Sequence, residues 1–230
     1  MLLLRRKTTY PGCSDFRSRL WLFKAIPIFI LLAAILPEPS FGENTRFRVI
    51  GDTLFFNGDI PREESGDHID MEGSDASEFG AYIMEQPEIT TIDLRSDGGS
   101  LEAGMTMVES IKRFNLNTQV TAGCYSACAY VFLAGFKRTL KPGGILGFHR
   151  SNAWSSGFVE IAKRRTMGWR KDNIATAAFD RGVDAGVRTG QFMASRGIDP
   201  EFILTVLATP PREIWVPTRT ELIAAGVLND

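Results

Sequence analysis

Residues 117–134, NTQVTAGCYSACAYVFLA, decide the fold of this chain, because within them a strand pattern turns into a buried helix. Residues 117–122 read as a short strand, and an apolar run from Ala127 to Ala134 follows the turn at residues 123–128. Ser126 therefore stands where its hydroxyl is presented at the open end of a sheet. The backbone N–H groups at a helix start also favour negative charge there. A reactive serine needs both an exposed hydroxyl and such donors for the oxyanion that it creates.

Two other turns complete a candidate site. Residues 92–95 have a strand pattern that ends in SDGGS at 96–100, where the paired Gly98 and Gly99 allow the backbone to approach a bound carbonyl or peptide closely. Residues 145–149, ILGFH, form a further strand pattern that ends in His149, 23 positions after Ser126. A helix and a return strand fill that interval, so we expect the imidazole to return to the same sheet edge.

This ordered set of motifs, strand–SxGG–helix, strand–GxxSAxA–helix and strand–His, resembles the Clp-type serine peptidases. It is more similar still to their exported bacterial relatives, in which two cysteines flank the serine. The similarity runs over residues 54–227 and implies an α/β fold of the ClpP/crotonase-like type, a spiral of ββα units. It also implies Ser126 as nucleophile, His149 as general base, and an oxyanion hole formed by the Gly98, Gly99 and Ala127 backbone. One departure is the aspartate in SDGG, where Clp peptidases usually carry proline, and it bears on the rigidity of the turn.

A serine–histidine pair needs a third group that holds the tautomer of the imidazole. In the Clp family that acid lies shortly before the last helix, which corresponds here to the region around Glu213. Glu213 is therefore the candidate, although glutamate replaces the usual aspartate, and Asp199 is the alternative. An unpartnered surface carboxylate remains an equal interpretation of either residue.

Length and composition set limits on the class of protein. A chain of 230 residues predicts one domain, here 43–230, with a substantial core. The formal net charge of −1 gives no electrostatic basis for nucleic-acid binding. The sequence contains no phosphate-binding G-x-x-x-x-G-K-[ST] motif, so we expect no use of ATP by this chain and no cofactor.

The first 42 residues predict export. A basic region precedes an apolar segment at 25–36, and small residues follow at Ser40 and Gly42, which is the pattern of a signal peptide. The apolar segment is short for a membrane span, but an uncleaved segment 25–36 would anchor the chain to a membrane. We therefore expect a periplasmic or secreted protein, membrane-anchored if cleavage fails.

The cysteines fit this expectation. Cys13 lies in the leader, which leaves Cys124 and Cys128 on either side of Ser126. At a spacing of four at a helix start their Cα atoms lie about 6 Å apart, within the range of a disulfide. An oxidising compartment favours the bond, while two buried thiols on a packed helix are the alternative. Two cysteines without neighbouring ligands make a poor zinc site, so no metal is expected.

The remaining pattern alternates strands and helices, which predicts parallel βα units after an N-terminal hairpin at 43–60. We expect a loop at 62–75, helices at 77–86 and 101–114, strands at 90–94, 138–140 and 213–216, a long helical region from 155, and helices at 200–207 and 218–225. The family resemblance implies that the long helical region reaches a neighbouring subunit of a homo-oligomer.

Simpler interpretations stand beside the catalytic one. Ser126 could serve only as a helix cap, His149 could be bonded to backbone, and the glycine pair could simply start a helix with Ser100 as its cap. The leading hypothesis is an exported, ATP-independent serine peptidase or hydrolase that acts on a peptide or protein. The alternatives are a catalytically inactive assembly or binding module on the same fold, and an acyl-CoA-binding protein of the crotonase type.

Overall fold

The computed structural model describes residues 46–61, 70–151 and 171–229. Contacts divide the chain into units 1–40 and 41–230, and all the described residues belong to the second. The predicted signal peptide and the apolar segment 25–36 lie outside the described residues. Within the described ranges, no helix combines the length and the apolar character that a membrane span requires.

A five-stranded sheet carries the first half of the unit. Its strands are β1 (Phe47–Ile50), β2 (Thr53–Asn57), β3 (Thr91–Arg95), β4 (Asn117–Val120) and β6 (Arg138–Leu140), which lie in that order. The predicted hairpin is confirmed, because β1 and β2 pair antiparallel around the turn at Gly51. The other neighbours in this sheet pair in parallel, as the alternation of strands and helices predicts.

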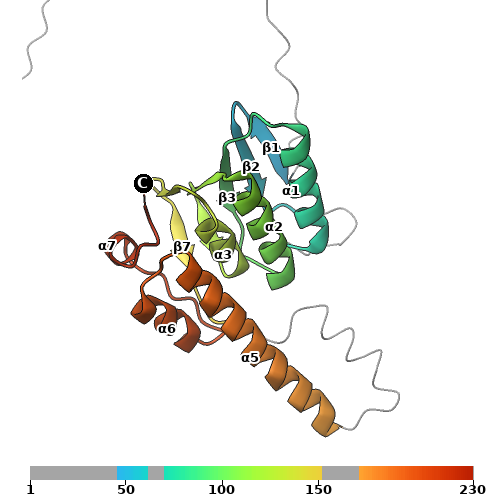
Figure 1. Cartoon of the computed structure of the whole chain (residues 1–230), viewed down its shortest axis with the longest axis vertical. Helices are drawn as coiled ribbons and strands as arrows, with labels where there is room; N and C mark the ends of the chain where they lie inside the picture. The colour runs from blue at the N-terminus through green and yellow to red at the C-terminus, as the bar shows by residue number, and fades with distance from the viewer. Residues whose placement is uncertain (1–45, 62–69, 152–170, 230) are drawn as a thin grey trace, which may run out of the picture. The chain divides into compact units, whose positions relative to one another are not determined.

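Three helices lie side by side in chain order, α1 (Gly73–Glu85), α2 (Leu101–Phe114) and α3 (Ala127–Leu133) (Figure 1). The buried residues of β3 show which face of the sheet contributes to the core. Ile92 and Leu94 are buried with the apolar residues of α2, such as Val108, whereas Asp93 between them points to the opposite face. All seven residues of α3 are buried, which explains why its sequence is apolar throughout.

A second, two-stranded sheet positions the candidate site. It pairs β5 (Gly123–Tyr125) with β7 (Ile145–Gly147) in parallel. Single bridges extend it on both sides, from Cys124 to Ser96 and from Phe148 to Trp215. The ends of β3, β5 and β7 are thereby brought next to one another, and each leads into one of the three predicted turns. Parallel strands place their carboxyl ends at one edge, which is where ligands bind in α/β sheets.

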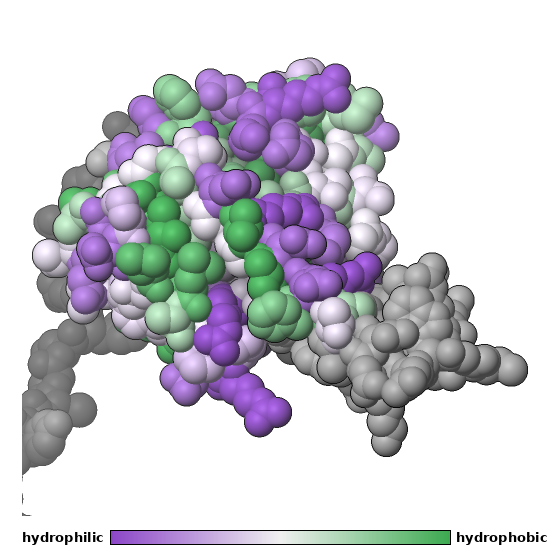
Figure 2. Space-filling view, turned by 60° about the horizontal axis from the view of Figure 1, so that its bottom comes forward, coloured by the Kyte–Doolittle hydropathy of each residue, from purple (hydrophilic) through white to green (hydrophobic). Residues whose placement is uncertain are grey.

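The last third of the described chain is helical. It consists of α5 (Lys171–Ser195), α6 (Pro200–Ala208) and α7 (Arg219–Ala224), and α5 contacts both α3 and α6. Large apolar side chains remain exposed on α5, at Phe179, Val183 and Val187, with a spacing of four that puts them on one helix face. Figure 2 shows that apolar residues reach the surface in patches among hydrophilic ones on the face that it displays.

Three sequence-based expectations differ from the structure. The helix expected from residue 77 starts at Gly73, because Glu72 and Asp75 form a reciprocal capping box there. Residues 123–125, assigned to a turn, form β5, which finds its partners only across the chain in β7 and Ser96. The strand expected at 213–216 is reduced to one bridge at Trp215. Part of the long helical region, 155–170, lies outside the described residues.

Candidate active site

Ser126 lies at the junction between β5 and α3 in an unusual backbone conformation. Its φ is 55° and its ψ is −122°, and Asn115 is the one other non-glycine residue with positive φ in the described part of the chain. Such a conformation costs about 1–3 kcal/mol and persists only where the surroundings impose it. The Ser126 N–H donates to Gly147 O at 3.0 Å, which ties the turn to β7. Ser126 occupies the cap position of α3, but its side chain makes no capping hydrogen bond, unlike a purely structural cap.

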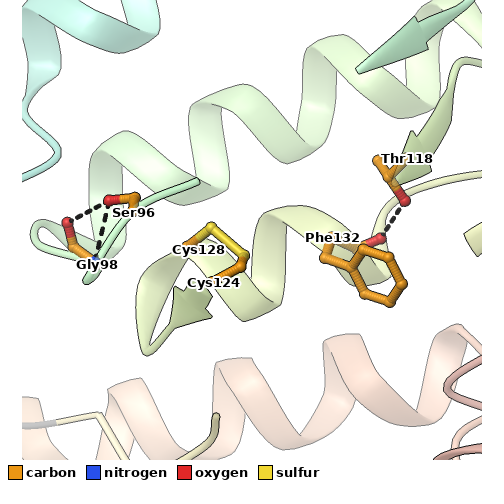
Figure 3. Close-up of a disulfide and its surroundings, with 6 residues drawn as sticks. All are labelled: Ser96, Gly98, Thr118, Cys124, Cys128 and Phe132. Carbon is orange, nitrogen blue, oxygen red and sulfur yellow. Dashed lines mark hydrogen bonds between the residues drawn. A yellow bond between two sulfur atoms is a disulfide. The ribbon is translucent and has the colours of Figure 1, made fainter. Parts of the chain in front are cut away.

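The two cysteines close a ring across this turn. Cys124 on β5 and Cys128 on α3 are joined by a disulfide, with their Cα atoms 5.3 Å apart, and both are fully buried (Figure 3). The disulfide geometry expected from their spacing is therefore present in the structure. The ring contains Ser126 and restrains both arms of the turn that holds its strained backbone.

The glycine pair packs directly against Ser126. Both glycines have positive φ, 112° at Gly98 and 133° at Gly99, a region that glycine enters without a steric penalty. The Gly98 N–H donates to Ser96 Oγ at 3.0 Å, and Figure 3 shows the Ser96 side chain folded back over this turn. Gly98 O accepts from Met71 N at 2.7 Å. The Gly98 amide is thus already engaged.

Two other backbone amides remain for an incoming oxyanion. Within the described part of the chain, the N–H groups of Gly99 and Ala127 take part in no hydrogen bond with another protein group, and both residues line the same cavity as Ser126. Ala127 is the first residue of α3, so its N–H is one of the unpaired amides at a helix start. Of the three amides named from the sequence, those of Gly99 and Ala127 are therefore unpaired among the described residues, whereas that of Gly98 is bonded within its own turn.

His149 follows β7 and lines this cavity together with Ser126. Its Nδ1 lies 2.8 Å from the backbone oxygen of Arg150. Because a carbonyl oxygen only accepts, Nδ1 carries the hydrogen, and Nε2 is the basic nitrogen of the neutral ring. This is the tautomer that a general base acting on a serine hydroxyl requires. Ser126 Oγ and His149 line one cavity, and no hydrogen bond joins them among the described residues.

Neither of the two carboxylates proposed as the third catalytic group lines the cavity of Ser126 and His149. Glu213 is exposed and does not line the cavity. Asp199 caps α6, where its Oδ1 accepts from Glu201 N at 2.9 Å and from Phe202 N at 3.2 Å. Nδ1 of the imidazole instead bonds to the backbone oxygen of the next residue, Arg150. Spacing in the sequence could not reveal this contact, which depends on the local path of the backbone.

The cavity has a volume of ≈ 360 Å³, and its walls are charged. One wall carries carboxylates at Asp70, Glu72 and Glu102, and α5 contributes Arg181, Asp184 and Arg188. The sequence motifs assigned none of these residues to the site, since none of them belongs to the three turns on which the prediction depends. Among the described residues, no group of three or more His, Cys, Asp or Glu side chains is arranged to hold a metal ion.

Comparison with known proteins gives a fold-level result. No protein-family model matches the chain, and no curated protein matches it. A solved structure of a ClpP1 mutant from Listeria monocytogenes is similar with a TM-score of 0.55 and 18% sequence identity, over 77% of this chain and 89% of that one. The chain therefore has a mixed α/β structure with a ClpP-like fold, as the sequence motifs predict.

Proposed function

We propose that this chain is a serine hydrolase, and specifically an ATP-independent peptidase, in which Ser126 is the nucleophile and His149 the general base. The observation that carries the proposal is the strained Ser126 turn, which opens into one cavity with His149 and with the unpaired amides of Gly99 and Ala127. Backbone strain of this kind is concentrated at functional sites.

The chemistry would be acyl transfer. Ser126 Oγ attacks the carbonyl carbon of a peptide or ester, while Nε2 of His149 accepts the hydroxyl proton. The carbonyl oxygen becomes an oxyanion, which the N–H groups of Gly99 and Ala127 stabilise, and loss of one such donor costs about 3 kcal/mol in comparable sites. The imidazolium then protonates the leaving amine or alkoxide, and water resolves the acyl-enzyme by the same steps. Charges of both signs in the cavity favour polar over purely apolar substrate side chains.

Labelling with a fluorophosphonate probe tests the proposal, because the probe phosphonylates only activated serines. We expect mass spectrometry to place the adduct on Ser126, with no adduct in Ser126→Ala and on the order of 100-fold slower labelling in His149→Gln. Ser110→Ala, which changes a half-buried serine on α2 outside the cavity, is the matched control and should label at the rate of the unaltered chain. An unlabelled Ser126 in correctly folded protein would overturn the proposal.

A non-catalytic binding module is the second candidate, and specific observations favour it. Ser126 Oγ and His149 are not hydrogen-bonded to each other, and no described carboxylate backs the imidazole. Catalytic hydrogen bonds are often long before substrate binds, so this geometry does not remove the catalytic proposal. Absence of labelling together with a retained fold would select the binding module.

We also propose that the protein is exported and forms a homo-oligomer. The buried Cys124–Cys128 disulfide supports an oxidising compartment, and the exposed apolar face of α5 supports a subunit contact. Fractionation of cells that express the full chain, followed by intact-mass measurement, should find the protein outside the cytoplasm and show whether segment 25–36 is retained. Light scattering after size exclusion should give a multiple of the chain mass, and a monomer at micromolar concentration would contradict the oligomer.

A further inference from the structure

Tyr130 lies on α3, four residues after Ser126, which is the cap residue of that helix. Tyr130 is 3% exposed, yet it lines the cavity that contains Ser126 and His149. Its hydroxyl lies 3.1 Å from the backbone oxygen of His149. One buried side chain therefore joins the helix that begins at the nucleophile to the segment that carries the base.

The direction of this hydrogen bond follows from the partners. A carbonyl oxygen cannot donate, so the phenolic hydrogen points at His149 O, and the phenolic oxygen remains as an acceptor. The side chains of Ser151 and Thr189 lie beside it, and Thr189 belongs to α5. Burial raises the pKa of the Tyr130 phenol above its ordinary value, which keeps it a neutral donor across the working range of pH.

The residue after His149 makes two hydrogen bonds that bear on the imidazole. Arg150 O accepts from Nδ1 of His149, and Arg150 N donates to Thr209 O at 3.1 Å. The peptide unit between His149 and Arg150 is thus fixed from one side by Tyr130 and from the other by Thr209. If the Tyr130 bond is lost, the peptide unit can rotate, and the Arg150 oxygen no longer aims at Nδ1.

We propose that Tyr130 is a positioning residue, which sets the orientation of His149 relative to Ser126 through the His149 backbone carbonyl. This inference rests on the proposed hydrolase function. Tyr130 does not exchange a proton with the substrate in this proposal. It acts by holding Nδ1 on its acceptor, so that Nε2 stays basic and faces the cavity.

The test compares Tyr130→Phe, which keeps the ring and removes the hydroxyl, with Tyr82→Phe on α1, where the ring packs on Phe47 away from the cavity. We expect fluorophosphonate labelling on the order of 10-fold slower in Tyr130→Phe, since small misplacement of a catalytic group is costly, and an unchanged rate in Tyr82→Phe. With an ester substrate, kcat should fall while KM stays within about 2-fold, because the hydroxyl contacts the protein and not the substrate.

Amide hydrogen exchange gives a second readout that does not depend on activity. Exchange at Arg150 should be faster in Tyr130→Phe than in the unaltered chain, while exchange in β3 stays the same and shows that the variant is folded. The role of Tyr130 would be overturned if Tyr130→Phe and the unaltered chain labelled at equal rates, or if their Arg150 amides exchanged at equal rates. A complete lack of labelling in the unaltered chain would instead overturn the proposed hydrolase function, and the exchange measurement separates these two failures.

Discussion

Gly98 lies so close to Ser126 that a methyl group on its Cα would come within 2.7 Å of the Ser126 Cβ and 2.9 Å of the Tyr125 oxygen. The turn that carries the glycine pair is therefore packed against the turn that carries the serine. Because both neighbours belong to the rigid β5–α3 junction, neither can move aside without disturbing the other. The shape of the site depends on the absence of a side chain at residue 98.

Gly98→Ala should consequently reduce both stability and reactivity. Overpacking combined with a φ of 112° predicts a loss of about 2–4 kcal/mol in the free energy of unfolding and a large loss of fluorophosphonate labelling. Urea denaturation and labelling kinetics measure the two effects. Gly80→Ala is the matched control, because a methyl group at this position of α1 meets nothing within 4 Å and should raise stability by about 0.5–1 kcal/mol. Normal labelling by Gly98→Ala would show that the two turns are not coupled.

Removal of the disulfide should loosen the Ser126 turn. A ring of this size restricts the unfolded chain by about 2 kcal/mol in the loop-entropy treatment, and its loss also frees the strained backbone of Ser126. The double variant Cys124→Ala, Cys128→Ala should therefore unfold at lower urea concentration and label more slowly than the oxidised chain. Treatment with a reductant should lower the urea midpoint and the labelling rate of the unaltered chain in the same way. It should leave both quantities unchanged in the double variant. Identical curves for oxidised and reduced protein would contradict the prediction.

A buried ion pair should contribute strongly to stability. Arg46 Nε lies 2.8 Å from Asp75 Oδ1, and both side chains are buried. The carboxylate also accepts from Glu72 N at 2.8 Å and so helps to start α1. Asp75→Asn leaves the guanidinium without its charge partner, which predicts a loss of about 3–5 kcal/mol in the free energy of unfolding.

The exposed pair Lys112–Glu109 on α2 is the control for this effect. Glu109→Gln should change stability by about 0.5 kcal/mol or less, because water screens the two charges. Chemical denaturation of both variants under identical conditions gives the comparison. A loss below 1 kcal/mol in Asp75→Asn would show that water reaches the Arg46 pair in solution.

Asp93 should make stability depend on pH. It is buried on β3, where Gln119 Nε2 donates to it at 2.8 Å and Thr121 Oγ1 at 2.9 Å. Burial nevertheless raises its pKa above the ordinary value, so the folded chain holds the proton more tightly than the unfolded chain does. The contribution of Asp93 to the free energy of unfolding is therefore largest below the ordinary carboxyl pKa. This contribution falls as the pH rises through the raised pKa of Asp93 in the folded chain.

Asp93→Asn removes this titration. We expect the variant to gain stability relative to the unaltered chain as pH is raised from 4 to 7, measured by urea denaturation at each pH. Asp180→Asn, at an exposed position of α5, is the control, and its free energy of unfolding should depend on pH as that of the unaltered chain does. A pH-independent difference between Asp93→Asn and the unaltered chain would contradict the assignment.

The local pattern of the sequence was sufficient for the elements and their order. The limits of α2 match the expected range because an amphipathic repeat carries its own period, and the limits of β6 match as well. The Ser126 turn and the return of His149 to the same edge were expected from the order of strands and turns, and the disulfide was one of two interpretations of the cysteine spacing. Strand β5 was missed because its residues fall within the turn expected at 123–128, and its partners lie at residues 96 and 145–147.

The sequence by itself determined that an alcohol, an imidazole and a glycine turn meet at the end of a parallel sheet, since strand order and residue spacing are local properties. Only the tertiary structure decided which groups are free and which are engaged. Ser96 Oγ accepts from the Gly98 N–H, and the Arg150 carbonyl accepts from Nδ1 of His149. The Tyr130 hydroxyl donates to the His149 carbonyl. Each is a hydrogen bond of about 3 Å. The first two join residues one or two positions apart and depend on the local path of the backbone, whereas the Tyr130 bond depends on how α3 packs against the segment that follows β7.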